Sequence, residues 1–207
     1  MKTTDIITNE EIIDEWSNTD KGINAELKRQ GYKFLGSGVD QSAYLEPGTG
    51  YVLKVFGTQP ELKGKPNKFS ADHKMFFTWA KFCMANPDNP YLPKFFGYES
   101  FVFNNHNYLQ IRQERLTKSG DLGDSIESIA DYLAYSTINE LFTTRAVSYE
   151  IDALMAVLGS KEEVARFGKT IKALQKIGNK KGWDWDLHGG NVMKRGKIPV
   201  IVDPWVV

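Results

Sequence analysis

Residues 32–57 read YKFLGSGVDQSAYLEPGTGYVLKVFG, and this stretch decides the fold that we expect. It contains three short runs rich in β-branched and aromatic residues, YKFLGSG, QSAYLEPGTG and YVLKVFG. Such runs, bounded by turn residues, are typical of strands, and the tetrapeptide PGTG at 47–50 is a strong turn signal between the second and the third. The pattern predicts a three-stranded antiparallel meander.

The segments that follow extend this sheet. Residues 70–85 predict a helix, because their large apolar residues fall on one face of a 3.6-residue period. These residues are Met75, Phe76, Trp79, Phe82 and Cys83. Two further strand-like runs, KFFGYESFVF and YLQIRQERL, flank the turn NNHN. We therefore expect five strands and one large helix by about residue 116.

The chain changes character after Gly120 and becomes mostly helical. Ser160 and Glu163 form a capping box that opens an apolar stripe, which Gly178 or Gly182 ends. A shorter helix is expected over 8–17. The chain closes with a strand, the turn KRGK and the strand IPVIVD. The fold class is α+β, a single domain with a β-rich first part over about 1–115 and a mainly helical second part over about 116–207.

Composition limits the classes of partner. The chain has 207 residues, of which 26 are Lys or Arg and 26 are Asp or Glu, so the formal net charge is zero. Bulk charge therefore favours neither nucleic acid nor an acidic membrane surface. The single cysteine, Cys83, fits a buried helix face. No secretory signal or membrane span is apparent, so we expect a cytoplasmic protein.

The two glycines in LGSGVDQ are the first candidates for chemistry. Gly36 and Gly38 lie between two predicted strands, where a backbone without Cβ atoms can approach a phosphate closely. A plain hairpin turn explains them equally well. No Walker A loop occurs, and a Rossmann fingerprint is disfavoured because a strand rather than a helix follows the glycines.

Lys54 interrupts the apolar strand YVLKVF. It can be an edge-strand lysine whose stem packs while its amine reaches water. Alternatively, it is an inward amine that pairs with phosphate oxygens beneath the glycine turn. The order glycine turn, hairpin and lysine in the third strand favours the second interpretation.

The stretch WDWDLHGGNVM at 183–193 carries the third candidate. Asp186 and Asn191 have the spacing D-x-x-x-x-N, in which the carboxylate can accept a hydroxyl proton and the amide oxygen can ligate Mg²⁺. Asp203 follows at the end of an apolar strand and can share the same metal. Each residue alone is an ordinary turn residue. The three together favour a site that positions and neutralises a phosphoryl group.

These motifs resemble the protein-kinase-like superfamily over about residues 31–205. Gly36, Gly38 and Lys54 resemble its glycine loop and third-strand lysine, DWDLHGGN its catalytic loop, and VDPW its D-F-G segment. The early serine/threonine kinases of short-tailed coliphages, which have D-P in place of D-F-G, are the most similar group. The resemblance implies a bilobal fold with a five-stranded antiparallel sheet and one helix in the first lobe.

The resemblance also implies roles for particular residues. Asp186 would be the catalytic base, and Lys54 would bind the α- and β-phosphates of ATP. Asn191 and Asp203 would hold Mg²⁺. Backbone groups near Glu114 would bind adenine, and Gly36, Ser37 and Gly38 would cover the phosphates. The acidic partner of Lys54 is open, with Asp72 as one candidate and a helix-capping acid as the alternative interpretation of that residue.

Departures from the family pattern concern regulation and substrate. Trp185 stands where the family has the arginine that binds a phosphorylated loop, so activation by loop phosphorylation is not expected. The chain ends at Val207, without an activation segment or the helices that follow it. We therefore expect a serine/threonine kinase with a reduced substrate platform, acting on a host protein in the host cytoplasm if the chain is viral. A partner protein can complete that platform.

Three alternatives stay open. D-L-H-G-G-N also suits a small-molecule kinase of the aminoglycoside or choline type, in which His188 orders the loop. A catalytically silent kinase-like domain that binds and inhibits a host protein is the second. Transfer of an AMP group instead of a phosphoryl group is the third. We expect neither a membrane nor a nucleic acid as a partner of this protein.

Overall fold

The structure is a computed structural model and describes residues 16–37, 41–57, 71–103, 106–135, 140, 142 and 148–206. Residues 8–15 of the helix expected over 8–17, and the glycine Gly38, lie outside these residues. The described residues form two compact units. One comprises those up to Ala80 together with Lys94–Arg115, and the other comprises Lys81–Pro93 together with those from Leu116 onward.

The helices are α1 (Trp16–Arg29), α2 (Ala71–Ala85), α3 (Asp121–Tyr135), α5 (Ser148–Leu158) and α6 (Lys161–Lys181), with a 3-10 turn η3 (Gly189–Asn191). The strands of the first unit are β1 (Lys33–Ser37), β2 (Gln41–Leu45), β3 (Tyr51–Gly57), β4 (Phe95–Phe103) and β5 (His106–Glu114). Those of the second unit are β6 (Thr117–Lys118), β7 (Asp184–Trp185), β8 (Val192–Arg195), β9 (Ile198–Ile201) and β10 (Trp205–Val206).

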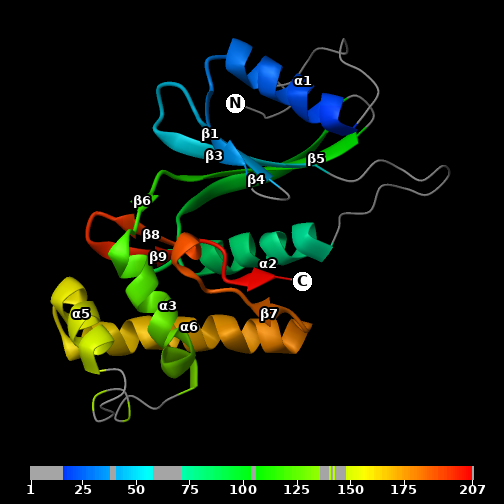
Figure 1. Ribbon diagram of the computed structural model, residues 1–207. Helices are drawn as coiled ribbons and strands as arrows, with labels where there is room; N and C mark the ends of the chain where they lie inside the picture. Colours follow the sequence, from blue (N-terminus) through cyan, green and yellow to red (C-terminus); the bar gives the residue numbers. More distant parts are fainter. Residues whose placement is uncertain are drawn as a thin grey trace. The chain divides into compact units, whose positions relative to one another are not determined.

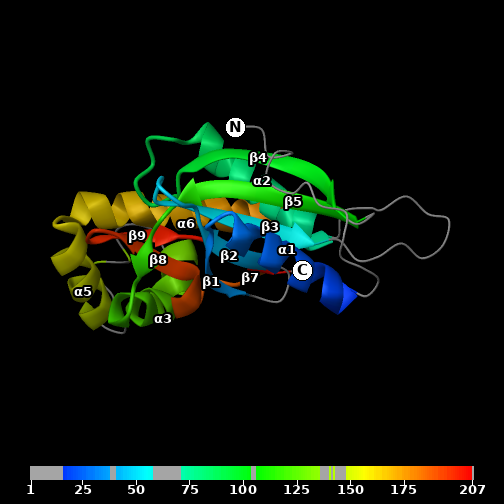
Figure 2. The ribbon, with the colours of Figure 1, turned by 90° about the horizontal axis from the view of Figure 1, so that it is seen from above.

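The first unit is built on one antiparallel sheet with the order β1-β2-β3-β5-β4 (Figure 2). The predicted α+β class, the five-stranded sheet and the helix over 70–85 are thus confirmed. β3 lies between β2 and β5, and its Lys54 is opposite Ala43 and Ile111. Because paired residues point to the same side of a sheet, this register assigns each side chain to a face.

Helix α1 covers one face of this sheet (Figure 1). Ile23 and Leu27 of α1 are buried against a cluster from the strands, which includes Tyr44, Leu53 and Tyr108. This helix was not predicted; the expected helix over 8–17 overlaps it only at its first two residues. α1 contributes only a narrow apolar stripe in an otherwise polar segment, so the burial that stabilises it comes from the sheet rather than from its own pattern.

Helix α2 supplies aromatic contacts to the opposite face. The ring of Phe76 lies 4.4 Å from that of Phe56 on β3 and 6.1 Å from that of Phe95 on β4. Farther along the helix, Cys83 is buried, and burial raises the pKa of its thiol well above the ordinary value. A buried, protonated thiol agrees with the interpretation of Cys83 as a core residue.

The second unit packs three helices with two small sheets, β6-β8-β9 and β10-β7. In α6, the predicted capping box is present, since Ser160 Oγ accepts a hydrogen bond from the Glu163 amide at 3.2 Å. The predicted stripe is buried through Leu174, and Gly182 ends the helix with φ of +70°. The pairs made by β6, β7 and β10 were not predicted, because strands of two residues carry no periodic signal.

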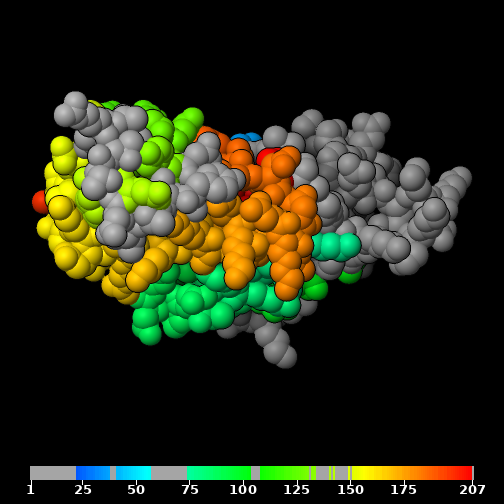
Figure 3. All heavy atoms as spheres, turned by 90° about the horizontal axis from the view of Figure 1, so that it is seen from below, coloured from blue at the N-terminus to red at the C-terminus, as the bar shows by residue number. Residues whose placement is uncertain are grey.

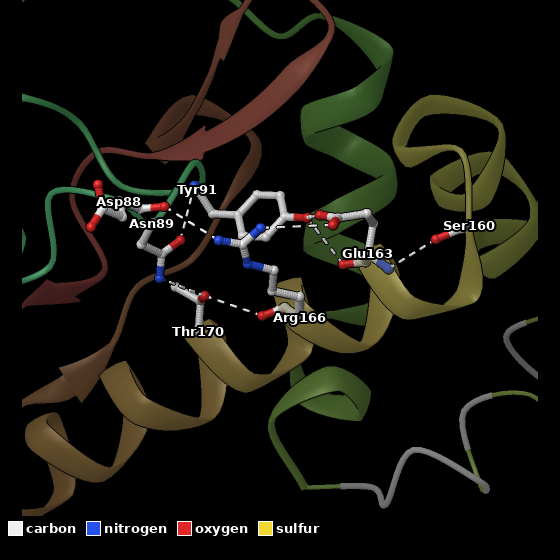
Figure 4. A network of polar contacts seen from close by, with 7 residues as sticks. All are labelled: Asp88, Asn89, Tyr91, Ser160, Glu163, Arg166 and Thr170. Carbon is white, nitrogen blue, oxygen red and sulfur yellow. Dashed lines mark hydrogen bonds and ion pairs between the residues drawn. The ribbon is translucent and has the colours of Figure 1, made fainter.

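The segment Lys81–Pro93 lies along α6 (Figure 3). Figure 4 shows the polar contacts that join them, in which the Tyr91 hydroxyl donates to Glu163 Oε2 at 2.5 Å and Asn89 Nδ2 donates to Thr170 Oγ1 at 3.0 Å. Burial, and then the bond to Glu163, raises the pKa of Tyr91. Within the described ranges, no helix combines the length and the apolar character needed to cross a membrane.

Candidate functional site

Lys54 lies in the central strand of the five-stranded sheet. It is half-buried on β3, and its Nζ lies 5.0 Å from the centroid of the Phe76 ring on α2. The edge-strand interpretation of this lysine is wrong, because β3 is flanked on both sides by other strands. The amine therefore lies on the α2 face, where a cation over an aromatic ring is favourable.

The glycine turn is described only in part. Gly36 and Ser37 belong to β1 and are opposite Ala43 and Ser42 on β2. The pairing shifts by one residue between Phe34 and Gly36, and a Cβ atom added at Gly36 would meet none of the described atoms within 4 Å. Gly36 thus leaves its side of the strand open. Gly38, the second glycine of the motif, lies outside the described residues.

Asp186 and Asn191 are joined directly by hydrogen bonds. Asn191 Nδ2 donates to the backbone oxygen of Asp186 at 2.7 Å and to its carboxylate Oδ2 at 3.1 Å. Because only the amide nitrogen can donate, these two bonds fix the orientation of the Asn191 side chain and turn its Oδ1 away from Asp186. Residues at the spacing D-x-x-x-x-N are thus hydrogen-bonded across one short loop, and these bonds hold the Asp186 and Asn191 side chains against each other.

Asp203 lies beside this loop. The residue before it, Val202, donates its amide to the Asn191 carbonyl at 2.9 Å. The residue after it, Pro204, accepts the Asp186 amide on its carbonyl at 3.0 Å. Both peptide neighbours of Asp203 are therefore bonded to the loop, so the second unit brings Asp186, Asn191 and Asp203 together. Asp184, by contrast, is exposed on β7 opposite Val206.

Between Asp186 and Asn191, His188 caps the 3-10 turn η3. His188 Nδ1 accepts a hydrogen bond from the Gly190 amide at 3.1 Å, and its Nε2 lies 3.9 Å from Asp186 Oδ2. A Cβ atom at Gly190 would lie 2.7 Å from the imidazole Cε1. Gly190 thus allows the imidazole to fold back over the turn, and His188 orders this loop.

Helix α3 holds the turn from the other side. Glu127 Oε2 accepts the Gly189 amide at 2.6 Å, and Ser119 Oγ donates to the Gly189 carbonyl at 3.4 Å. A Cβ atom at Gly189 would lie 2.5 Å from Asp124 Oδ1 and 3.3 Å from the Asp124 amide nitrogen, so a larger residue here would displace the Asp124 carboxylate. Glu127 and Ser119 were not predicted, because they lie 62 and 70 residues before Gly189 and no local pattern marks them.

Trp205 anchors the end of the segment. It is 2% exposed, pairs with Trp185 between β10 and β7, and donates its Nε1–H to the Leu174 carbonyl at 3.1 Å. A Cβ atom at Gly178 on α6 would lie 2.8 Å from that nitrogen. The glycine therefore makes room for the indole, and the indole fixes the chain just beyond Asp203 onto α6.

The other two predicted residues lie in the first unit. Glu114 ends β5, where its Oε1 accepts the Lys94 amide at 2.8 Å and its own amide donates to the Lys94 carbonyl at 2.9 Å. Its carboxylate thus closes the β4–β5 ladder. Asp72 belongs to the first turn of α2, and its side chain is outside the described part.

The donors at this site suit a hard cation in part. Within the described residues, no group of three or more His, Cys, Asp or Glu side chains has the arrangement of a metal site. Asn191 and Asp203 offer one amide oxygen and one carboxylate. Mg²⁺ is commonly held by one or two carboxylates together with waters and substrate phosphates, so this pair fits Mg²⁺ bound with a phosphate ligand better than a site made by protein alone.

The second unit therefore holds the Asp186 carboxylate and the Asn191 amide in one loop, with the Asp203 carboxylate on the segment bonded to that loop. Lys54, Gly36, Ser37 and Glu114 belong to the other compact unit. In comparisons with known proteins, no family model matches this chain, and no curated protein matches it.

Proposed function

We propose that this chain is an ATP- and Mg²⁺-dependent phosphotransferase with a protein-kinase-like bilobal arrangement, and that it acts on Ser or Thr hydroxyls of a protein. The observation that carries the proposal is the bonded set in the second unit. Asn191 binds the backbone and the carboxylate of Asp186, and both neighbours of Asp203 bind the same loop. An ordinary polar turn does not need three such side chains in one place.

In the proposed reaction, Asp186 accepts the proton of the acceptor hydroxyl while the oxygen of that hydroxyl attacks the γ-phosphorus of ATP. The new P–O bond forms while the bond from the γ-phosphorus to the β,γ-bridging oxygen breaks, and ADP leaves with that electron pair. Asn191 holds Asp186 in place through its two hydrogen bonds. Catalysis of this kind is mainly positioning and electrostatic stabilisation.

The remaining roles concern nucleotide binding. Lys54 pairs with the α- and β-phosphates, Gly36, Ser37 and Gly38 cover them, and backbone groups near Glu114 hold adenine. Asn191 and Asp203 are the residues that would hold Mg²⁺, which when bound neutralises phosphate charge. The position of Lys54 on the α2 face of β3, rather than at a sheet edge, supports this assignment.

The test is transfer of radioactive phosphate from ATP labelled at the γ-position, with Mg²⁺ and bacterial lysate as acceptor. Asp186→Asn removes the base and is expected to lower the initial rate by about 10²- to 10⁴-fold while ATP binding, measured by calorimetry, persists. Asp184→Asn is the matched control, because Asp184 lies two residues away and is exposed on β7. That variant should stay within about two-fold of wild type.

Three outcomes separate the alternatives. Equal labelling by wild type and Asp186→Asn would overturn the proposal, and absence of ATP binding would favour a silent binding domain. Label that appears only from ATP carrying the isotope at the α-position would indicate AMP transfer. Phosphorylation of aminoglycosides or amino alcohols, with no labelled protein, would replace the protein kinase by a small-molecule kinase.

A further inference from the structure

A cavity of about 180 Å³ opens on the sheet of the first unit, at strands β3, β4 and β5. A cavity of about 150 Å³ accommodates one benzene ring, so this one has room for a single small planar molecule. Its described lining consists of Leu53 from β3, residues 96–99 from β4, and Gln110 and Arg112 from β5.

The strand register places these residues on one face of the sheet. Arg112 is opposite Leu53 on one side and Gly97 on the other, and Gln110 is opposite Glu99. Directly paired residues point to the same face, with Cβ atoms about 4.5 to 5.5 Å apart. Leu53 belongs to the cluster that α1 covers, so the cavity lies on the α1 face.

This face is not the one that carries the proposed nucleotide site. Lys54, the residue after Leu53, lies on the α2 face, where its Nζ is 5.0 Å from the centroid of the Phe76 ring. Adjacent strand residues point to opposite faces. The inference drawn from the cavity therefore does not rest on the proposed function.

The side chain of Gln110 is the feature that points to a ligand. It is 2% exposed, and within the described part of the chain neither its Nε2 nor its Oε1 has a hydrogen-bond partner. Arg112 Nε, two residues along on the same face, is likewise buried without a partner in that part. Buried amides are nearly always paired, because an unpaired buried donor or acceptor destabilises the fold. The Gln110 amide therefore suits a hydrogen-bonding group placed in the cavity.

The chemistry of that amide defines the group. A glutamine side chain carries an N–H donor and an oxygen acceptor next to each other. Its complement is an edge on which an acceptor lies beside an N–H, and the two then form a pair of parallel hydrogen bonds, as glutamine does with adenine. Carboxamides and nucleobases both have such an edge.

The cavity walls suit a neutral, flat body. The Phe96 ring is stacked on that of Tyr51 with centroids 4.4 Å apart and is 46% exposed, so it offers a fixed apolar surface. The charge of Arg112 is already paired, since its Nη2 lies 2.6 Å from Glu46 Oε1. An anionic ligand would also meet Glu99, which is acidic and lies opposite Gln110.

We infer that this cavity binds a small, neutral, planar molecule with an amide-like edge, of the size of one six-membered ring. The edge pairs with both polar atoms of Gln110, and Arg112 Nε donates to a further acceptor of the ligand. The ring lies against Leu53 and Phe96. Gln110 is thus the residue that determines specificity for the amide edge.

The test compares benzamide with acetophenone, which has the same shape but carries a methyl group in place of the NH₂ donor. Binding to the full-length, ¹⁵N-labelled protein is followed by chemical-shift titration. Benzamide should bind with a dissociation constant of about 1 mM or tighter and should shift the side-chain amide signals of Gln110. Acetophenone should bind at least about five-fold more weakly, because it leaves Gln110 Oε1 unpaired.

Gln110→Leu removes the amide and keeps a side chain of similar size. In this variant benzamide and acetophenone should bind equally, and the urea midpoint should be no lower than that of wild type, because no paired group is lost. Gln113→Leu is the matched control. Gln113 is a glutamine of the same strand that is 4% exposed, but it is opposite Phe95, whose ring contacts Phe76 on the α2 face. That variant should keep the preference for benzamide within about two-fold of wild type.

The proposal is overturned if benzamide does not bind, if wild type binds acetophenone equally well, or if Gln110→Leu keeps the preference. A marked drop in the urea midpoint of Gln110→Leu would also overturn it, because the amide would then be paired within the folded protein. Displacement of benzamide by uracil or by nicotinamide supports it and distinguishes a nucleobase from a carboxamide, whereas failure of both contradicts it. Unchanged benzamide binding by Lys54→Met supports it whether or not the chain transfers phosphate.

Discussion

Lys54 in the first unit and the Asp186 loop in the second unit are held in place in different ways. Lys54 lies in a seven-residue strand that is paired along its length with β2 on one side and β5 on the other. Asp186 and Asn191 lie in the short loop between the two-residue strand β7 and the four-residue strand β8, and Asp203 lies between the four-residue strand β9 and the two-residue strand β10. The strand is held by many equivalent bonds, whereas the loop depends on a few individual contacts.

This difference predicts how each part responds to substitution. A ladder of backbone hydrogen bonds does not depend on any single side chain, so changing Lys54 leaves the other pairs in place. Three contacts fix this part of the chain. Trp205 donates a hydrogen bond to α6, Glu127 of α3 accepts one from the loop, and the Tyr91 carbonyl accepts the amide of Ile201 at the end of β9. Loss of one of these contacts should therefore have a larger effect than loss of a side chain from β3.

The largest effect is expected from Trp205→Ala. Removing this 2% exposed indole and its hydrogen bond to Leu174 should lower the free energy of unfolding by about 3 to 5 kcal/mol, measured by urea denaturation. Val206→Ala, at the next position and 45% exposed, should change it by less than about 0.5 kcal/mol. Similar losses in the two variants would show that the indole is not the anchor.

A smaller loss is expected from Gly178→Ala. The new Cβ would lie 2.8 Å from Trp205 Nε1, and displacing the buried indole should cost more than the helix gains by losing a glycine. We expect a net destabilisation of about 1 to 2 kcal/mol. The exposed Lys176→Ala on the same helix is the control, with little change expected. A Gly178→Ala variant more stable than wild type would disprove the tight fit.

The contribution of Tyr91 depends on pH. Its carbonyl accepts the Ile201 amide of β9 at 3.0 Å, and its hydroxyl binds Glu163. Because folding raises the pKa of the phenol, its stabilising effect is complete below about pH 10, the ordinary tyrosine value, and is lost as the pH rises above it. Tyr91→Phe should cost about 1 kcal/mol at pH 7.

Urea denaturation of Tyr91→Phe and wild type between pH 7 and pH 11 measures this dependence. The difference between the two proteins should shrink above pH 10, by up to about 1.4 kcal/mol per pH unit. Tyr149→Phe controls for general alkaline effects, because Tyr149 is 80% exposed. A difference that stays constant over the whole range would mean that the Tyr91 phenol ionises equally in the folded and unfolded states.

The smallest effect on stability is expected from Lys54→Met. The variant keeps a stem of similar length over Phe76 and all backbone pairs of β3, so its free energy of unfolding should lie within about 1 kcal/mol of wild type. If Lys54 binds the phosphates of ATP as proposed, the affinity of this variant for ATP, measured by calorimetry, should be lower than that of wild type. A loss of stability as large as that of Trp205→Ala would abolish the contrast between strand and loop.

Much of the fold was readable from sequence where a period repeats. The five strands, α2 and the capped α6 each have several residues that follow the same pattern. The α1 helix and the strands β6, β7 and β10 were missed, since α1 depends on burial against the sheet and the others are two residues long. Their stability comes from partners distant in the chain, which no window of sequence contains.

For the candidate site, the sequence by itself determined which side chains are available: a lysine in an apolar strand, and Asp186, Asn191 and Asp203 at set intervals. Spacing within one loop also determined that Asn191 can reach Asp186. Only the tertiary structure decided that β3 is a central strand, that Glu127 holds Gly189, and that Gly178 admits Trp205. The physical reason is that local periodicity fixes the direction of side chains along one element, whereas contacts between elements depend on packing that the whole chain determines.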